Sequence, residues 1–168
     1  VRRLARTPTA YRREGVVWIE GEHLCSAWAA RGQPAAQALV SESAWRIEAL
    51  RALATSASRV VCVPDALFAG VSALESPGGV GFLVDLPAMP ALDPMTASVV
   101  LDRLQDAGNV GSILRSAAAM GYRQVVALEG TAALWSPKVL RAGMGAHFGL
   151  RLIEGATPEL LDRLAVPL

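Results

Sequence analysis

The sequence has few of the residues that build covalent or metal-based frameworks. Its two cysteines, Cys25 and Cys62, lie far apart and neither belongs to a CxxC pair, so neither a disulfide framework nor a zinc site is indicated. We expect both to be buried free thiols. Its two histidines, His23 and His147, have no second histidine at ligand spacing. We therefore expect no metal and no catalytic histidine.

Long apolar runs and a large net charge are also missing. Apolar residues make up 52% of the 168 positions, but no run approaches the roughly 18 apolar residues of a membrane span. The basic start, Val1 to Arg6, is followed by polar sequence and so does not resemble a secretory signal. We expect a cytoplasmic protein with no membrane partner. The net charge of +1 also excludes a polycation.

Positive charge is concentrated at the start of the chain. Arg2, Arg3, Arg12 and Arg13 lie close together, and Glu14 is the neighbouring acid. Arginine presents a planar fork of donors that suits phosphate oxygens, so the cluster is a candidate RNA-binding surface. A solvated helix face would give the same pattern, and the cluster alone does not decide between the two.

The first half of the chain alternates predicted strands and helices, which indicates a small α/β domain over residues 1–86. The predicted strands are 16–20, 38–40, 59–63 and 80–85, and the predicted helices are 1–13, 24–30, 43–54 and 65–69. Residues 87–97 follow with three prolines, at positions 87, 90 and 94, and form a semi-rigid linker.

The second half, residues 98–168, restarts the alternation. Strands are predicted at 98–101, 124–128 and near 150–153, and helices at about 109–120, 137–143 and 158–164. Strand-helix-strand units at this spacing predict a parallel sheet. Ser136 followed by Pro137 is a typical helix start. The four tryptophans lack the spacing of a base-stacking platform, and we interpret them mainly as core or interface residues.

The segment after the first of these strands is the most informative part of the sequence. A loop with Gly108 and Gly111 opens a helix, and in an open parallel sheet such loops bind ligands beyond the carboxyl ends of the strands. The pattern is not the GxGxxG dinucleotide fingerprint. Helical spacing directs Val110, Ile113, Leu114, Ala117 and Gly121 toward the sheet. It places Ser112, Arg115 and Ser116 on the other side.

The run Asp106 to Arg115, DAGNVGSILR, resembles the first signature motif of the SpoU/TrmH family of RNA 2′-O-ribose methyltransferases, in the SPOUT superfamily. The run Leu134 to Phe148, LWSPKVLRAGMGAHF, resembles the family's middle segment. The first half, with RREG at 12–15 and EGEH at 20–23, is similar to an RNA-binding extension that itself resembles certain ribosomal proteins. Ala107 departs from a common proline, and Gly143 from a common serine.

The resemblance implies a function and two catalytic residues. Members transfer a methyl group from S-adenosylmethionine to a ribose 2′-hydroxyl, and Asn109 and Arg115 match the motif asparagine and the essential arginine. A guanidinium stays protonated in proteins, so we expect Arg115 to stabilise developing negative charge rather than to act as a base. Asn109 would order the loop or hold the ribose. Lys138 and Arg141, early in the predicted helix 137–143, are further candidates for RNA contact.

The resemblance also implies a knotted methyltransferase fold, a homodimer, and ribosomal RNA as a target ahead of transfer RNA. Nothing from Glu154 to Leu168 resembles the later family motifs of the donor pocket, so we expect the cofactor-binding residues beyond Leu168 and no proper S-adenosylmethionine site in this chain alone. Two alternatives stay open. One is a truncated, non-catalytic RNA-binding relative, and the other is an unrelated α/β nucleotide-binding protein.

Overall fold

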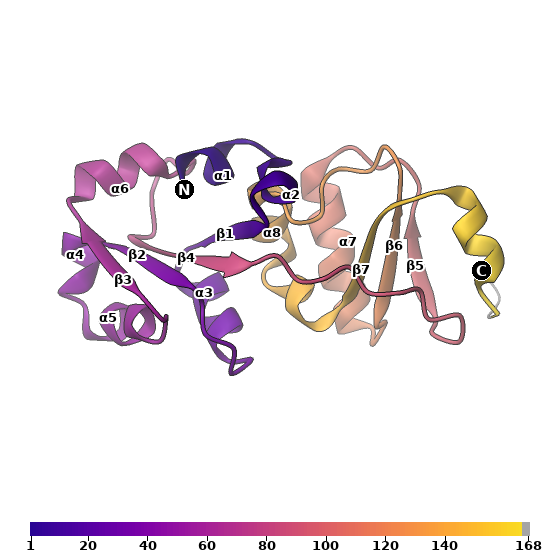
Figure 1. Cartoon of the computed structure of the whole chain (residues 1–168), viewed down its shortest axis with the longest axis horizontal. Coiled ribbons are helices and arrows are strands. Elements are labelled where there is room, and N and C mark those ends of the chain that lie inside the picture. Colours follow the sequence, from indigo (N-terminus) through magenta and orange to yellow (C-terminus); the bar gives the residue numbers. More distant parts are fainter. Residues whose placement is uncertain (166–168) are drawn as a thin grey trace. The chain divides into compact units, whose positions relative to one another are not determined.

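The computed structural model describes residues 1–165 and contains two compact units. The first comprises residues 1–86 together with 135–137. The second comprises residues 87–134 and the described residues from 138 onward. Each unit combines a β-sheet with helices (Figure 1), which confirms the predicted α/β class.

The first unit is built on a four-stranded sheet with the order β1-β4-β2-β3. Its strands are β1 (Val16–Glu20), β2 (Gln37–Ser41), β3 (Val60–Val63) and β4 (Val80–Asp85). Strands β2 and β3 are parallel, and the other pairs are antiparallel. All four strands lie where short apolar runs predicted them, and β-branched residues are most frequent in β1 and β3, where such side chains pack well on a pleated surface.

Helices cover both faces of this sheet. Helices α3 (Glu22–Ala29) and α5 (Glu48–Thr55) lie on one side, and α1 (Arg2–Arg6) and α6 (Asp65–Val71) lie on the other (Figure 1). Of the tryptophans, Trp18, Trp28 and Trp135 are buried, as expected for core residues.

Two predicted helices of this unit are wrong, because each is split. The predicted helix 1–13 consists of α1 and α2 (Ala10–Glu14), separated at Pro8, whose ring nitrogen cannot donate a helical hydrogen bond. The predicted helix 43–54 consists of α4 (Glu42–Trp45) and α5, because Ile47 adopts an extended backbone conformation between them.

The expectation that both cysteines are buried is wrong for Cys62. Cys25 is fully buried beneath the sheet, and burial raises the pKa of its thiol. Cys62 lies on β3, the edge strand of the sheet, where its side chain is exposed. Both thiols are free. Strand β3 has a partner on one side only, so its side chains are less covered than those of the central strands.

The second unit contains a three-stranded parallel sheet in the order β5-β6-β7, which confirms the predicted parallel pairing. The strands are β5 (Ser98–Leu101), β6 (Gln124–Leu128) and β7 (Arg151–Ala156). The crossovers contain α7 (Ala107–Ala119), α8 (Pro137–Gly143) and the short 3-10 helix η1 (Ala146–Gly149). The central strand β6 is buried at every position, as expected for a strand covered on both faces.

The two faces of this sheet are covered by different elements. Helix α7 lies on one face, and the 3-10 helix η2 (Pro158–Arg163) lies on the opposite one (Figure 1). Under η2 the core includes Val126, Leu128 and Ile153. The predicted α-helix 158–164 is therefore a 3-10 helix. Within the described residues, every helix is too short or too polar to cross a bilayer.

The proline-rich segment 87–97 contains no helix or strand, but its second half is anchored to the second unit. Leu92 is buried in the core beneath η2. The side chain of Gln124 forms a paired contact with the backbone of Asp93, with distances of 2.9 Å to its N–H and 3.1 Å to its carbonyl oxygen. These contacts fix the path by which the chain enters β5.

Candidate functional site

The glycine-bearing loop follows a parallel strand, as predicted. Strand β5 ends at Leu101, and α7 begins at Ala107, so residues 102–106 lie at the carboxyl edge of the sheet. The Asp106 carboxylate accepts a hydrogen bond from the backbone N–H of Asn109 at 2.7 Å and caps the helix. A Cβ on Gly108 would lie 3.1 Å from the same oxygen. This contact is with a side chain, so a small shift of the carboxylate would relieve it.

The loop after β5 is joined to the loop after β6 by hydrogen bonds. The Thr131 hydroxyl donates to the Leu101 carbonyl at 3.0 Å, and the Ala132 N–H donates to the Leu104 carbonyl at 2.9 Å. Arg103 adopts a left-handed backbone conformation, with φ of 52°, and its side chain lies against Gly130. Non-glycine residues seldom adopt this conformation, so these contacts must hold it.

Strand β7 is also hydrogen-bonded to the loop after β6. The N–H of Leu134 donates to the Glu154 carboxylate at 2.6 Å, and the Leu134 carbonyl lies 2.9 Å from Nε2 of His147. His147 is buried, and burial lowers its pKa to about 4, so its ring is neutral near pH 7. His147 therefore belongs to the packing around the edge.

Helices α7 and α8 approach each other closely at two glycines. A Cβ on Gly111 would lie 2.4 Å from the Cβ of Ala142 and 2.7 Å from the backbone nitrogen of Gly143. A Cβ on Gly143 would lie 2.5 Å from Cε1 of His147. A side chain at Gly111 would force the two helices apart, whereas a side chain at Gly143 would collide with the His147 ring. The glycine at 143 is thus required by the buried ring of His147.

Asn109 and Arg115 are both exposed on α7. They lie about 9 Å apart along the helix axis and roughly a third of a turn apart around it. Within residues 1–165, neither side chain forms a hydrogen bond or an ion pair, so both can bind a ligand. Arg115 follows Gly111 by four residues, which places it about one turn beyond the α7–α8 contact on the same side of the helix.

The predicted inward face of α7 is mostly as expected. Val110, Leu114 and Ala117 are buried against the sheet, and Ile113 is half-buried. Gly121 was wrongly assigned to this face. It is exposed just after the helix, with φ of 86°, because it belongs to the turn that ends α7.

The structure places the N-terminal arginines on two short helices and engages several of them. Glu14 forms ion pairs with Arg3 at 3.7 Å and Arg13 at 2.8 Å, and Arg12 stacks over the Tyr11 ring at 5.7 Å. Arg2 is exposed beside them. Because Glu14 offsets part of the charge, the cluster is a weaker phosphate site than its sequence suggests.

The two predicted RNA contacts of α8 differ in exposure. Lys138 is exposed in the first turn, whereas Arg141 is half-buried in the last turn. No group of three metal-ligating side chains is present within the described residues. The main features that sequence reasoning missed are the Arg103–Gly130 contact and the Gly111–Gly143 packing. In the sequence, the first was indicated only by an arginine at a turn, Arg103, and the second only by an isolated glycine in a helix, Gly111.

Comparisons with known proteins agree with this arrangement. Residues 96–165 match the SpoU rRNA Methylase family. The chain is 34% identical, over 163 residues, to rRNA methyltransferase 3A, mitochondrial, from Danio rerio, covering 88% of this chain and 37% of that protein. It is 31% identical over 97 residues to the 23S rRNA (guanosine(2553)-2′-O)-methyltransferase RlmP from Bacillus subtilis, covering 58% of this chain and 39% of that protein.

Among solved structures, the fold is similar to that of the SpoU methyltransferase AviRb from Streptomyces viridochromogenes in complex with AdoMet. The TM-score is 0.82 with 24% identity, covering 96% of this chain and 63% of the other. The chain thus spans less than half the length of the two curated relatives and less than two thirds of the solved chain.

Proposed function

Because the chain belongs to the SpoU rRNA methylase family, we propose that this protein transfers a methyl group to a ribose 2′-hydroxyl of RNA, with ribosomal RNA as the substrate class. The observation that carries the proposal is the position of Arg115. It is an exposed guanidinium that forms no ion pair within residues 1–165, on the helix that begins at the carboxyl edge of a parallel sheet, behind a capped glycine-bearing loop.

The 2′-hydroxyl is a weak acid, so its attack on a methyl group requires stabilisation of negative charge on the oxygen. A guanidinium remains protonated in proteins and cannot accept the hydroxyl proton. We assign Arg115 to hold the hydroxyl oxygen, or the adjacent phosphate, through its two-pronged donor edge. No side chain of this chain is assigned as the base.

Asn109 is assigned to position the substrate. Its backbone N–H is fixed by the Asp106 cap, so the side chain leaves the first turn of α7 from a rigid base. A side-chain amide offers both donors and an acceptor, which suits a ribose hydroxyl. The exposed cations Arg2, Arg3, Arg12, Arg13 and Lys138, together with the half-buried Arg141, would add phosphate contacts whose strength falls with salt.

The methyl donor expected for this reaction is S-adenosylmethionine, to which the solved relative AviRb is bound. The amide donors of Glu129, Thr131, Ala132 and Leu134 at the sheet edge already bond within the fold. We therefore assign no residue to the donor. We also propose a homodimer in the cytoplasm that uses no metal ion.

The test is methyl transfer by the protein expressed from its complete reading frame, with labelled S-adenosylmethionine and unmodified ribosomal RNA. Arg115→Lys keeps the charge but loses the planar fork, and we expect the rate to fall about 100-fold. Arg123→Lys is the matched control, since Arg123 is exposed just before β6, at the opposite edge of the sheet. It should leave the rate unchanged.

Two results would contradict the proposal at different levels. If the wild-type protein transfers no methyl group to any RNA, the proposed activity is wrong. If Arg115→Lys retains the full rate while the protein is active, the activity stands but the assignment of Arg115 is wrong.

A further inference from the structure

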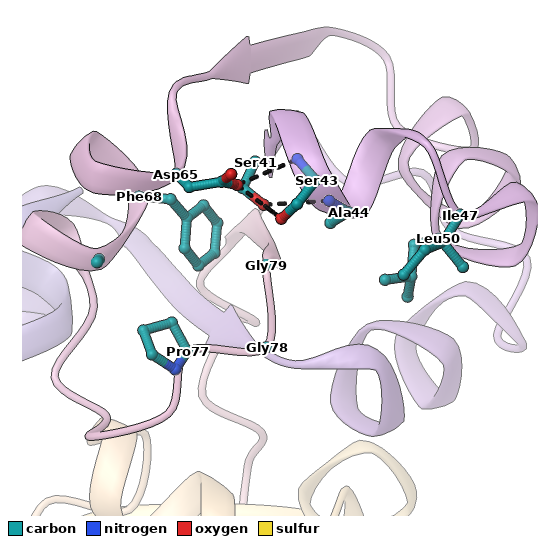
Figure 2. Close-up of a pocket in the computed structure, with 11 residues that line it drawn as sticks. Ser41, Ser43, Ala44, Ile47, Leu50, Asp65, Phe68, Pro77, Gly78 and Gly79 are labelled. Carbon is teal, nitrogen blue, oxygen red and sulfur yellow. Dashed lines mark hydrogen bonds between the residues drawn. The ribbon is translucent and has the colours of Figure 1, made fainter.

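The first unit contains a cavity of about 390 Å³ that methyl transfer does not use (Figure 2). It lies where the parallel strands β2 and β3 end and where α4 and α6 begin. Its volume is in the range of small-molecule sites. Such crevices beyond the carboxyl ends of parallel strands are common ligand sites, although here only one strand pair is parallel.

Apolar side chains line two sides of the cavity, with Phe68 and Pro77 on one side and Ile47 and Leu50 on the other (Figure 2). Phe68 and Leu50 are buried and form its inner part, and Ile47 is 54% exposed at the surface. Pro77 contributes a further apolar surface from the segment before β4 (Figure 2). An exposed isoleucine beside buried apolar side chains leaves a surface that a flat, weakly polar group can cover.

The part of the lining between these two sides is polar (Figure 2). Oδ1 of Asp65 accepts hydrogen bonds from the backbone N–H of Ser43 at 3.1 Å and from its hydroxyl at 2.7 Å (Figure 2). These bonds, first of all the one from the Ser43 hydroxyl, lower the pKa of the Asp65 carboxyl, so it is ionised near pH 7. A carboxylate repels phosphate but accepts N–H donors, and its two oxygens can accept more bonds than Ser43 supplies.

The cavity is preformed because its glycine turn is fixed. Gly79 has φ of +71°, and its carbonyl accepts a hydrogen bond from the Ser41 N–H at 2.8 Å. A Cβ on Gly79 would lie 2.7 Å from the Cβ of Ala44. Only glycine fits this position, so the turn cannot easily shift to fill the space. A preformed cavity binds its ligand without the loss of conformational entropy that ordering its lining residues would require.

A cation lies within electrostatic reach of Asp65. Arg46 is exposed, and its positive charge contributes to lowering the pKa of Asp65, so it lies within electrostatic reach of the carboxylate. Apolar side chains on two sides, an acceptor for N–H groups and a nearby arginine match the three parts of a nucleotide that is not paired. These parts are the face of the base, its donor edge and its phosphate.

Resting on the proposed function, we propose that this cavity binds one unpaired base of the RNA substrate. The base packs against Ile47, Leu50 and Phe68, its N–H groups donate to Asp65, and Arg46 contacts a neighbouring phosphate. Guanine should bind best, because it presents two N–H donors side by side on one edge. The first unit would thereby select an exposed nucleotide at a distance from the methylated ribose.

The test uses fluorescein-labelled RNA hairpins that differ at one bulged position, which carries guanine, adenine, cytosine, uracil or no base. Binding to the full chain is followed by fluorescence anisotropy at fixed salt. We expect guanine to bind tightest and the abasic hairpin to bind about tenfold more weakly, in line with the measured contribution of one stacked base.

Two variants link this preference to the cavity. Ile47→Ser should weaken binding of the guanine hairpin about threefold, with no effect on the abasic hairpin. Asp65→Asn should abolish the preference for guanine over adenine. The controls are Leu67→Ser, which is 55% exposed on α6 but outside the lining, and Asp85→Asn, at the far end of β4. Both should bind every hairpin like the wild type.

Three outcomes would overturn the proposal. The chain could bind all hairpins, the abasic one included, with equal affinity. It could bind none of them. The variants could alter the oligomeric mass measured by light scattering and not the RNA affinity, in which case the cavity is a contact between copies. The methyltransferase proposal is judged separately, by transfer to ribosomal RNA and by Arg115→Lys, so each can fail without the other.

Discussion

Replacing Gly111 by alanine should destabilise the second unit, although the same change in most helices is stabilising. Alanine in a helix interior is favoured over glycine by about 1 kcal/mol. Here the new Cβ would lie 2.4 Å from the Cβ of Ala142 and 2.7 Å from the backbone nitrogen of Gly143. Because one of these neighbours is backbone, helix α8 must move as a whole.

The magnitude follows from these opposing effects. Overpacking a tight core site typically costs about 1–3 kcal/mol, and contacts this short favour the upper part of that range. After the gain in helix propensity, we expect a net loss of about 1–2 kcal/mol. For a unit of this size that corresponds to a transition lower by roughly 5–10 °C.

Gly108→Ala is the matched control, because it lies in the same helix and its Cβ would approach only the Asp106 carboxylate, at 3.1 Å. We expect its stability to remain within about 0.5 kcal/mol of the wild type. Unfolding is followed in urea by far-UV circular dichroism, which reports both units. Tryptophan fluorescence reports the first unit, to which all four tryptophans belong.

The reasoning fails if Gly111→Ala is as stable as Gly108→Ala. A second check is the double variant Gly111→Ala with Ala142→Gly. It removes the Cβ–Cβ clash but keeps the approach to Gly143, so its loss of stability should be smaller than the sum of the losses of Gly111→Ala and Ala142→Gly measured singly. A loss equal to that sum would show that the clash is not the cause.

Three further predictions concern the cap, the buried histidine and the turn of the first unit. Asp106→Ala should cost about 1 kcal/mol by loss of the helix cap, measured in urea, whereas Asp102→Ala, which breaks an exposed ion pair, should cost less than about 0.5 kcal/mol. Burial lowers the pKa of His147 to about 4. Its contribution to the free energy of unfolding is therefore complete above the unfolded pKa near 6.5 and is lost as the pH falls toward 4. A His147→Gln variant should lack this part of the dependence of the unfolding free energy on pH, measured from about pH 7 to 4. Gly79→Ala should lower stability by more than Gly32→Ala, since both have φ of +71° but only the former meets neighbouring atoms, and equal losses in parallel urea titrations would contradict this.

Much of the fold follows from local patterns. Strands β1, β4 and β6 are runs of apolar, partly β-branched residues, and residue type together with the flanking turn residues identified them. The break in the helix predicted for 43–54 could not be predicted from the spacing of its apolar residues. The backbone of Ile47 is extended there, and its side chain lines a cavity formed with distant residues, which apolar spacing does not register.

The candidate site shows the same division. The loop before α7 and the exposed side of Arg115 followed from a strand, a glycine-containing turn and helical spacing. The left-handed conformation of Arg103 could not be predicted from the local sequence, because the residue that its side chain contacts, Gly130, lies 27 positions further along the chain. Nor could the partial neutralisation of the N-terminal arginines, because the ion pair of Arg3 with Glu14 spans two separate helices.

The hydrogen bonds between the loops at the carboxyl edge limit how this protein can diverge. Leu101 is hydrogen-bonded to Thr131, Leu104 to Ala132, and Leu134 to Glu154, so the segments after β5 and β6 and the strand β7 are joined to one another. An insertion in one segment would pull its neighbours out of register. Relatives with another specificity should therefore vary the length of these segments together, or leave them alone and vary the other unit.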